Sequence, residues 1–236
     1  MAKVVGLSRN IKLLWLNYTV ELLLDGLSDE EIRDKLNIYL GYEIKSETNL
    51  RKSREILFRI WATPNEYSDK LRDKALELVE KYPEYKLAIH WCMLLVAYPI
   101  FYTVNWYIGK LFDFKDVVKL SQIREKLYDE WGERTTLYHS LDKLLATLKN
   151  FDVLDSKGKG MYSLKIYDIP NKEVVKFMLY TLMLVEGKTY YSCANLSEQP
   201  VFYPFKFSID KADISNDDRF KLTLFNGETN VVLPDT

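Results

Sequence analysis

The sequence is poor in the residues that most often hold metal ions or form disulfides. It contains two histidines, His90 and His139, and two cysteines, Cys92 and Cys193, which lie about a hundred residues apart. No zinc site with the usual ligand spacing can be assembled from such a set. We therefore expect no metal or other cofactor, and we expect both thiols to be reduced and packed as small apolar side chains.

Sequence motifs of catalysis are also missing. The tripeptide at 187–189 ends like a phosphate-binding loop, but Leu182 stands where that loop requires its first glycine. The tripeptide at 43–45 matches half of a nuclease motif, but no upstream Pro-Asp pair supplies the second metal-binding carboxylate. The Gly-x-Ser-x-Gly elbow of hydrolases is absent as well. These absences favour a protein that binds a ligand over one that catalyses a reaction.

Neither sign of charge is in excess. The chain has 33 Lys and Arg residues against 34 Asp and Glu residues, which leaves a net charge of -1 at pH 7. Nucleic-acid binding must therefore come from a local basic patch, because no global positive field exists. The N-terminus also lacks the basic, apolar and cleavage regions of a secretory signal, so we expect a cytoplasmic protein.

One stretch lacks charge altogether. Residues 87–109 contain no Asp, Glu, Lys or Arg, and a run of that length would reach across a bilayer. The same run contains His90, Asn105 and a central Pro99, whereas a membrane-spanning helix prefers Leu, Ile and Val. We therefore expect two buried helical segments that meet at Pro99, where proline removes a backbone donor, and no membrane partner.

The first part of the chain has the pattern of three short helices joined by tight turns. Residues 10–24 are apolar on nearly every side, as in a buried helix. A capping box at Ser28 starts the second helix. Ser46 or Thr48 caps the third helix, which covers residues 49–61. This order is typical of a helix-turn-helix region.

The third helix and the turn before it form the most basic run in the chain. Its basic residues are Lys45, Arg51, Lys52, Arg54 and Arg59. In the functional interpretation this helix contacts the phosphate backbone of DNA, with Lys45, Arg51, Lys52 and Arg54 as the binding residues. The alternative is a solvated helix face without a ligand, since any surface helix carries charged residues.

The clearest local pattern lies in residues 116–166. We expect an amphipathic helix that includes Val117 and Val118, and then a second helix after a short turn. A turn over 155–160 and a strand over 161–166 follow. Helix, turn, helix and hairpin in this order predict a winged-helix module.

In a winged helix the second helix and the tip of the hairpin approach DNA. The residues that we expect to contact DNA from this module are Arg134, Thr135, Tyr138, His139, Lys143, Lys157 and Lys159. Their side chains are of the types that bond phosphates and base edges. Winged helices also serve as protein-contact modules, and Asp142, Asp152 and Asp155 dilute the basic face. A partner protein is therefore the alternative ligand.

The rest of the chain, residues 169–236, predicts a small α+β unit. A helix begins after Pro170, and apolar residues alternate with polar ones over 205–209 as in a strand. Asn226-Gly227 is the preferred dipeptide for a two-residue hairpin turn. We therefore expect a β-hairpin at the end of the sequence.

Five segments of the chain are informative when their order along the sequence is considered. They are the capped helix start at 26–32, the helix end at 59–61, the long segment 135–154, the motif at 202–205 and the hairpin at Gly227. In this order, and over most of the chain, they resemble the BrxA family of the bacteriophage exclusion (BREX) defence systems. The resemblance implies a soluble, helical, non-enzymatic protein that binds DNA through a helix-turn-helix region and a winged helix.

The fold expected is mainly α, with an N-terminal helical domain over 1–112, a winged-helix module over 113–168 and a C-terminal α+β unit over 169–236. The leading hypothesis is a non-catalytic component of a phage-defence system that binds double-stranded DNA and other subunits of that system, with no small-molecule substrate. The alternative is a protein-interaction scaffold that uses the winged helix for partner contacts without direct nucleic-acid binding. An enzyme is the most distant of the three hypotheses.

Overall fold

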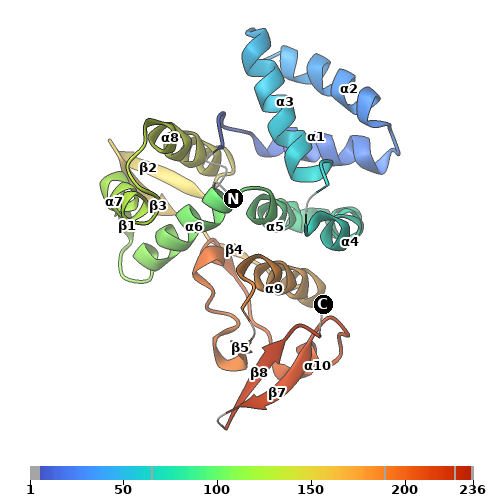
Figure 1. Ribbon diagram of the computed structural model, residues 1–236, viewed down its shortest axis with the longest axis vertical. Coiled ribbons are helices and arrows are strands. Elements are labelled where there is room, and N and C mark those ends of the chain that lie inside the picture. Colours follow the sequence, from blue (N-terminus) through green and yellow to red (C-terminus); the bar gives the residue numbers. More distant parts are fainter. Residues whose placement is uncertain (1–5, 65, 189, 226, 235–236) are drawn as a thin grey trace.

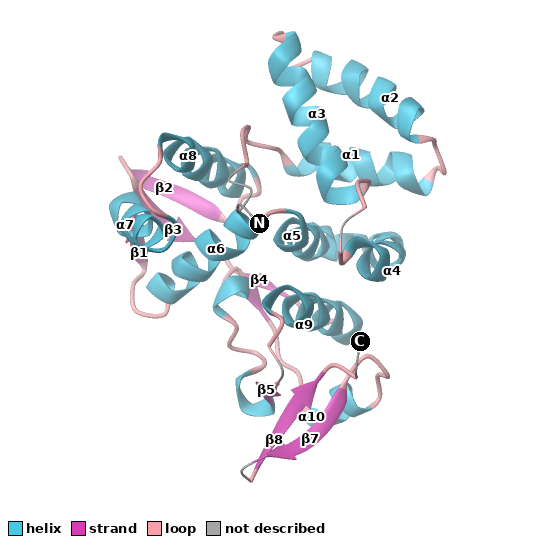
Figure 2. Cartoon of the chain, in the orientation of Figure 1, coloured by secondary structure: helices cyan, strands magenta, loops and turns pink. Residues whose placement is uncertain are grey.

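The computed structural model describes residues 6–64, 66–188, 190–225 and 227–234, except the side chains at 68 and 69. The chain is mainly helical, with 60% of its residues in helices and 12% in strands. The described strands form three small sheets, which Figure 2 shows in magenta among the helices. The expectation of a mainly α fold is therefore confirmed.

Three helices form an N-terminal group, namely α1 (Leu13–Leu24), α2 (Asp29–Gly41) and α3 (Glu47–Trp61). Helix α2 begins with the expected capping box, in which Ser28 accepts from the backbone N–H of Glu31 and the Glu31 carboxylate accepts from the backbone N–H of Ser28. Of the two caps considered for α3, the Ser46 side chain accepts from the backbone N–H of Asn49. The local capping signals of the sequence thus determine where α2 and α3 begin.

Residues 6–12 form an extended segment, which we call the N-terminal arm. The arm lies against helix α8 (Thr135–Asn150), where the backbone N–H of Ile11 donates to Thr147 Oγ1 at 3.1 Å and Asn150 Nδ2 donates to the Ile11 carbonyl at 3.0 Å. The backbone of Lys12 is extended, with φ -112° and ψ 148°, and α1 starts at Leu13 and not at residue 10, where the sequence predicted it.

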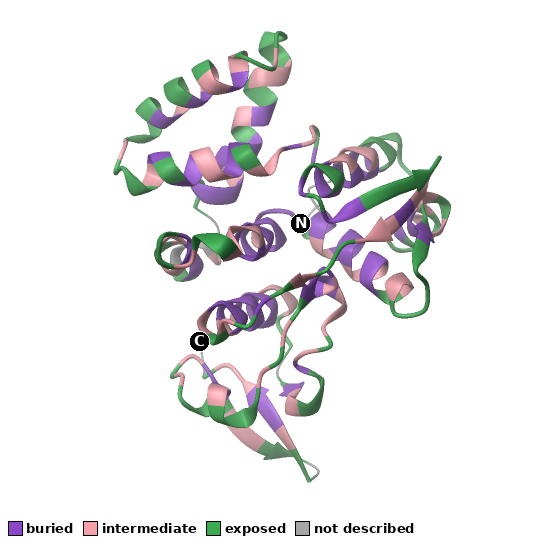
Figure 3. Cartoon of the chain, turned by 180° about the vertical axis from the view of Figure 1, so that it is seen from behind, coloured by how far each residue is buried: buried purple, intermediate pink, exposed green. Residues whose placement is uncertain are grey.

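The uncharged stretch lies in the centre of the molecule. Helix α4 (Ser68–Lys81) and the short 3-10 helix η1 (Pro83–Tyr85) lead into α5 (Lys86–Ala97), and Pro99 starts α6 (Pro99–Phe112). Nearly every residue of α5 is buried, and Figure 3 shows buried residues gathered on α5 and α6. The two helices that the sequence predicted are therefore present. Among the described residues, no helix combines the length and the apolar character that crossing a membrane requires.

A buried histidine joins three of these helices. Trp61 Nε1 on α3 donates to His90 Nδ1 on α5 at 3.1 Å, and His90 Nε2 lies 2.9 Å from Asn17 Oδ1 on α1. Since Nδ1 accepts from the indole, Nε2 carries the ring proton and donates to the amide oxygen. Burial lowers the pKa of His90 to about 3, so the imidazole is neutral and acts as a structural hydrogen-bonding group.

The middle of the chain combines helices with a small sheet. Its elements are β1 (Val117–Lys119), α7 (Leu120–Trp131), α8, β2 (Leu154–Gly158) and β3 (Met161–Leu164). The strands pair antiparallel in the order β1-β3-β2. The expectation that Val117 and Val118 lie in a helix was wrong. They form β1, with Val118 buried opposite Tyr162, because β-branched residues fit a pleated surface once a partner strand is present.

The hairpin between β2 and β3 is tighter than the sequence predicted. Residues 155–160 were expected as a turn, but Asp155 and Ser156 pair with β3 and the strand continues to Gly158. Gly158 and Gly160 have φ values of 148° and 69°, which glycine adopts without a steric penalty. The strands therefore stay paired almost to the tip. The expected strand over 161–166 ends at Leu164.

Helix α6 lies between two parts of the molecule. It packs against α7 and β1 on one side, and against α5 and the short 3-10 helix η3 (Pro200–Phe202) on the other. The sequence grouped α6 with the N-terminal domain over 1–112. In the structure α6 also contacts β1 of the three-stranded sheet that follows it, and Figure 1 shows α6 beside β1 and α7.

The C-terminal part surrounds one long helix. Its elements are β4 (Tyr167–Asp168), α9 (Lys172–Glu186), β5 (Tyr191–Ser192), η2 (Cys193–Asn195), η3, β6 (Phe205–Lys206), α10 (Lys211–Ser215), β7 (Lys221–Phe225) and β8 (Glu228–Val232). Helix α9 packs on α5, and Asn171 caps its start. Strands β4 and β6 pair parallel, and a second sheet has the order β5-β8-β7.

Two C-terminal expectations need comment. The strand predicted over 205–209 is limited to β6, because its partner β4 ends before Pro170, which has no backbone N–H to pair. The terminal hairpin is confirmed, since β7 and β8 pair antiparallel on either side of Gly227, whose φ is 79°. Asn226, the other residue of the predicted turn, lies outside the described residues.

Candidate nucleic-acid interface

Helix α8 exposes a polar stripe at its N-terminal half. Thr135, His139 and Lys143 follow one another at i, i+4 and i+8, so they lie on one face of the helix. The opposite face is buried, including Leu137, Leu141 and Leu144. Hydrophobic burial of the leucines therefore orients the polar stripe toward solvent.

Tyr138 lies beside this stripe and is held by an arginine of the preceding helix. The Arg124 guanidinium on α7 lies 4.4 Å from the centre of the Tyr138 ring, a cation–π distance. The ring of His139 meets Tyr138 edge-on, with 5.5 Å between the ring centres. Arg134 precedes the helix as its N-cap residue and is exposed. At the start of α8 the Tyr138 ring therefore contacts both the Arg124 guanidinium and the His139 ring.

The β2–β3 hairpin carries two lysines next to α8. Lys157 and Lys159 are exposed near the tip, and neither forms an ion pair with a described residue. Tyr162 lies on β3 opposite Ser156, where burial and then the charge of Asp142 raise the pKa of its hydroxyl. The carboxylate of Asp142 therefore lies close to the hairpin. The carboxylate of Asp152 is neutralised by an ion pair with Lys165.

The four basic residues predicted at α3 have different surroundings. Arg51 and Lys52 are exposed and form no ion pair within the described part of the chain. Arg54 is half-buried and is bound by Glu55 at 2.7 and 3.0 Å, and by Asn37 Oδ1. Lys45 Nζ donates to the Gly41 carbonyl at the end of α2. Arg51 and Lys52 therefore remain available to an external anion, whereas Arg54 is already engaged.

The N-terminal arm bonds to both α3 and α8, and the sequence did not predict these contacts. Arg9 donates from Nε and Nη2 to Asn49 Oδ1 on α3 at 3.0 and 2.7 Å, while Ile11 is bound to α8. Figure 1 shows the arm running between the two helices. An extended segment of mixed composition has no periodicity, so the sequence offers no signal for this contact.

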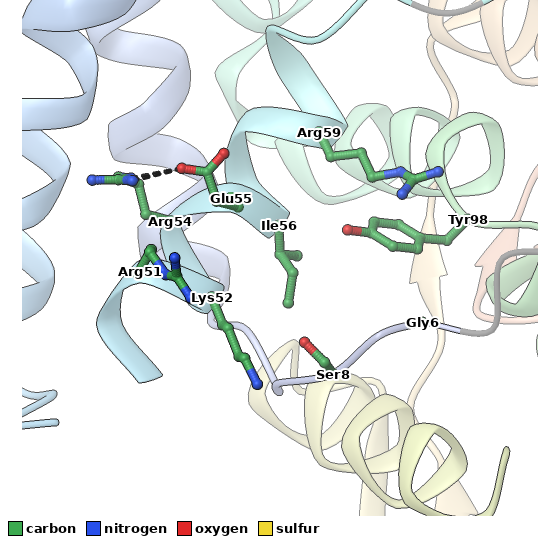
Figure 4. Close-up of a pocket in the computed structure, with 9 residues that line it drawn as sticks. All are labelled: Gly6, Ser8, Arg51, Lys52, Arg54, Glu55, Ile56, Arg59 and Tyr98. Carbon is green, nitrogen blue, oxygen red and sulfur yellow. Dashed lines mark hydrogen bonds and ion pairs between the residues drawn. The ribbon is translucent and has the colours of Figure 1, made fainter. Parts of the chain in front are cut away.

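A pocket of about 520 Å³ opens between α3 and the arm. Figure 4 shows Lys52 reaching toward Ser8 of the arm, and Arg59 lying over the ring of Tyr98 at the inner side. The Arg59 guanidinium is 5.2 Å from the centre of that ring. Arg59 belongs to the basic run of the sequence, but Tyr98 comes from the junction of α5 and α6, where only the fold places it.

The chemistry of metals and thiols is absent from this surface. Within the described ranges, no group of three or more His, Cys, Asp and Glu side chains is placed to hold a metal ion. Cys92 is buried and Cys193 is half-buried, and both are free thiols. Burial raises the pKa of both thiols, which disfavours the reactive thiolate.

Comparisons of the chain with protein-family models, with curated proteins and with solved structures found no match.

Proposed function

We propose that the chain binds double-stranded DNA without catalysing a reaction, as a component of a prokaryotic phage-defence system of the BREX type. The observation that carries this proposal is the set of cations without carboxylate partners among the described residues. Those assigned to the interface lie on α3, at the start of α8 and on the β2–β3 hairpin, in a chain whose net charge is -1. Local positive charge of this kind attracts the phosphate backbone although the chain as a whole is nearly neutral.

The order of the elements supports a winged helix as the DNA-binding module. Helix α6, strand β1, helices α7 and α8, and strands β2 and β3 follow one another in the order of that motif. In this interpretation α8 is the recognition helix, with Thr135 and His139 toward base edges. Lys157 and Lys159 form the wing and contact phosphates.

The α2–α3 pair supports a second contact. The turn between the two helices is short, and α3 exposes Arg51 and Lys52 near its N-terminal end. In a helix-turn-helix arrangement this end approaches the phosphate backbone. The defence role itself rests on the resemblance to the BrxA family.

A salt series with variants tests DNA binding. We expect the full chain to retard duplex DNA in a gel, with log affinity falling linearly against log salt. Lys157→Ala with Lys159→Ala, and separately Arg51→Ala with Lys52→Ala, should each reduce that slope by about two, since each lost phosphate contact removes about one. Binding should weaken to a similar degree on unrelated duplex sequences.

A matched control removes the same charge elsewhere. Lys206 and Lys221 are exposed in the C-terminal part and form no ion pair with described residues. Lys206→Ala with Lys221→Ala should leave the salt slope of the parent unchanged. If both interface variants bind like this control, these surfaces do not contact DNA and the proposal is wrong.

Exposed apolar side chains favour a scaffold as the second candidate function. Leu14 on α1, Ile38 on α2 and Tyr42, which follows α2 as its C-cap residue, are 64%, 66% and 76% exposed. Ile38 and Tyr42 are four residues apart, and Tyr42 has helical φ and ψ values of -64° and -33°, so it continues the helix face of Ile38. Apolar surface that stays exposed often marks a protein contact. Binding to a partner subunit that is unaffected by the lysine variants, without retardation of DNA, would favour this function.

A further inference from the structure

The pocket between α3 and the N-terminal arm has an excess of positive charge. Of its four cations, Arg54 is neutralised by Glu55, the one carboxylate in its lining, and Glu55 also lies 3.9 Å from Arg33. Arg51, Lys52 and Arg59 line the same pocket and have no carboxylate partner among the described residues. Three uncompensated cations around one concave site repel one another unless an anion lies between them.

The inner wall of the pocket adds a hydrogen-bond donor. Tyr98 is only 2% exposed, yet its hydroxyl has no hydrogen-bond partner among the described residues and points into the pocket in Figure 4. Burial raises the pKa of this hydroxyl, so it stays protonated at neutral pH and can donate. Because this hydroxyl opens on the pocket and bonds to no described side chain, it can donate to a ligand oxygen there.

Arg59 is positioned for an anion by the same tyrosine. Its guanidinium stacks over the Tyr98 ring at 5.2 Å, which restricts its side chain without using its N–H donors. A planar guanidinium with free donors matches phosphate oxygens in a bidentate way. Lys52 faces the arm across the pocket and supplies a second, more mobile charge.

The size and lining of the pocket exceed the needs of an inorganic anion. A volume of about 520 Å³ lies in the range of roughly 300–1,000 Å³ that small-molecule sites occupy. Ile56 provides an apolar wall beside the cations. We propose that this pocket binds a nucleotide through its terminal phosphate, with Arg59 and the Tyr98 hydroxyl on the phosphate oxygens and the nucleoside toward Ile56.

Two sources can supply this chemistry, namely a free mononucleotide and the 5′-phosphorylated end of a DNA strand. The strand-end source rests on the proposed DNA-binding function, whereas the free nucleotide does not. A terminal phosphate fits the pocket better than an internal phosphodiester does, because it carries more negative charge and projects from the end of its chain.

Calorimetric titration of the full chain tests the pocket with three probes: adenosine 5′-monophosphate, adenosine and inorganic phosphate. We expect the monophosphate to bind more tightly than either fragment. Arg59→Gln should weaken this binding by about tenfold to a hundredfold, which is the usual effect of losing a charged hydrogen bond. Arg59→Lys should lie between the parent and Arg59→Gln, because it keeps the charge and loses the bidentate geometry.

Tyr98→Phe removes the hydroxyl and keeps the ring under Arg59. We expect it to weaken monophosphate binding by several-fold, to about tenfold, without unfolding the protein. Lys206→Gln is the matched control and should bind like the parent. Equal binding of monophosphate and adenosine, equal binding of monophosphate and inorganic phosphate, or a monophosphate affinity unchanged by Arg59→Gln would each overturn the proposal.

Duplexes with and without 5′-phosphates separate the two sources. If a strand end occupies the pocket, the phosphorylated duplex binds more tightly than the unphosphorylated one. Adenosine 5′-monophosphate then displaces the phosphorylated duplex and does not displace the unphosphorylated duplex. If the two duplexes bind equally while the monophosphate titrates the pocket, the source is a free nucleotide. Failure of both duplexes to bind contradicts the proposed function, and it leaves the monophosphate titration as an independent test of the pocket.

Discussion

Replacing Gly109 by alanine tests how closely α6 meets the C-terminal part of the chain. A Cβ atom on Gly109 would lie 2.0 Å from the carbonyl oxygen of Pro200 and 2.7 Å from its carbonyl carbon. Real Cβ atoms stay at least 3.0 Å from such neighbours, so α6 and η3 must move apart. Overpacking of a core costs about 1–3 kcal/mol, and more when backbone atoms resist the shift. Alanine recovers about 1 kcal/mol through its higher helix propensity.

The net effect expected for Gly109→Ala is a loss of about 2 kcal/mol in the free energy of unfolding, because the clash involves backbone on both sides. For a chain of this size that corresponds to a fall of roughly 4–8 °C in Tm, measured by circular dichroism during thermal unfolding. Gly41 at the end of α2 is the matched control, since its nearest neighbour is Leu50 Cδ1 at 3.7 Å. Gly41→Ala should leave Tm unchanged or raise it. A Gly109→Ala variant as stable as the parent would refute the close contact between α6 and η3.

Three further predictions concern the arm, the buried histidine and the polar stripe. Thr147→Val leaves the N–H of Ile11 without its acceptor at a buried site and should lower the free energy of unfolding by about 1–3 kcal/mol in chemical denaturation. The folded pKa of His90 is depressed from 6.5 to about 3, so its contribution to stability is lost as the pH falls between these values. His90→Gln should therefore lose less stability than the parent over that range, and equal losses would contradict the assignment. Thr135→Ala with His139→Ala should reduce the preference among duplex sequences in competition gel shifts and leave the salt slope unchanged.

The sequence predicts the N-terminal and central helices well because their signals are local. The capping box at Ser28 and the cap at Ser46 satisfy backbone groups within a few residues, so each acts before any tertiary contact forms. Pro99 likewise breaks the uncharged stretch by removing one backbone donor. The ends of these helices can therefore be predicted directly from the amino-acid sequence.

Features that depend on contacts between residues far apart in the sequence are predicted less well. Val117 and Val118 continue the apolar pattern of the following helix, and only the pairing of β1 with β3 makes them a strand. The candidate pocket has the same origin. Arg59 stands in a basic run that the sequence displays, but Tyr98 becomes its neighbour through the packing of α3 against α5. The spacing of residues along the chain does not predict the contact between Arg59 and Tyr98.

The N-terminal arm relates the two surfaces on which the proposed function depends. Arg51 and Lys52 on α3 and the polar stripe on α8 are separated by most of the helical part of the chain, so covalent proximity does not set their relative position. The arm bonds to Asn49 at the start of α3 and to Thr147 and Asn150 at the end of α8. A rigid duplex that touches both helices requires a defined spacing between them, because phosphates repeat at fixed intervals. Hydrogen bonds of the arm to both helices supply that spacing, and the arm also forms one wall of the pocket beside Arg59. Affinity for DNA across both surfaces should therefore depend on residues that contact no phosphate at all.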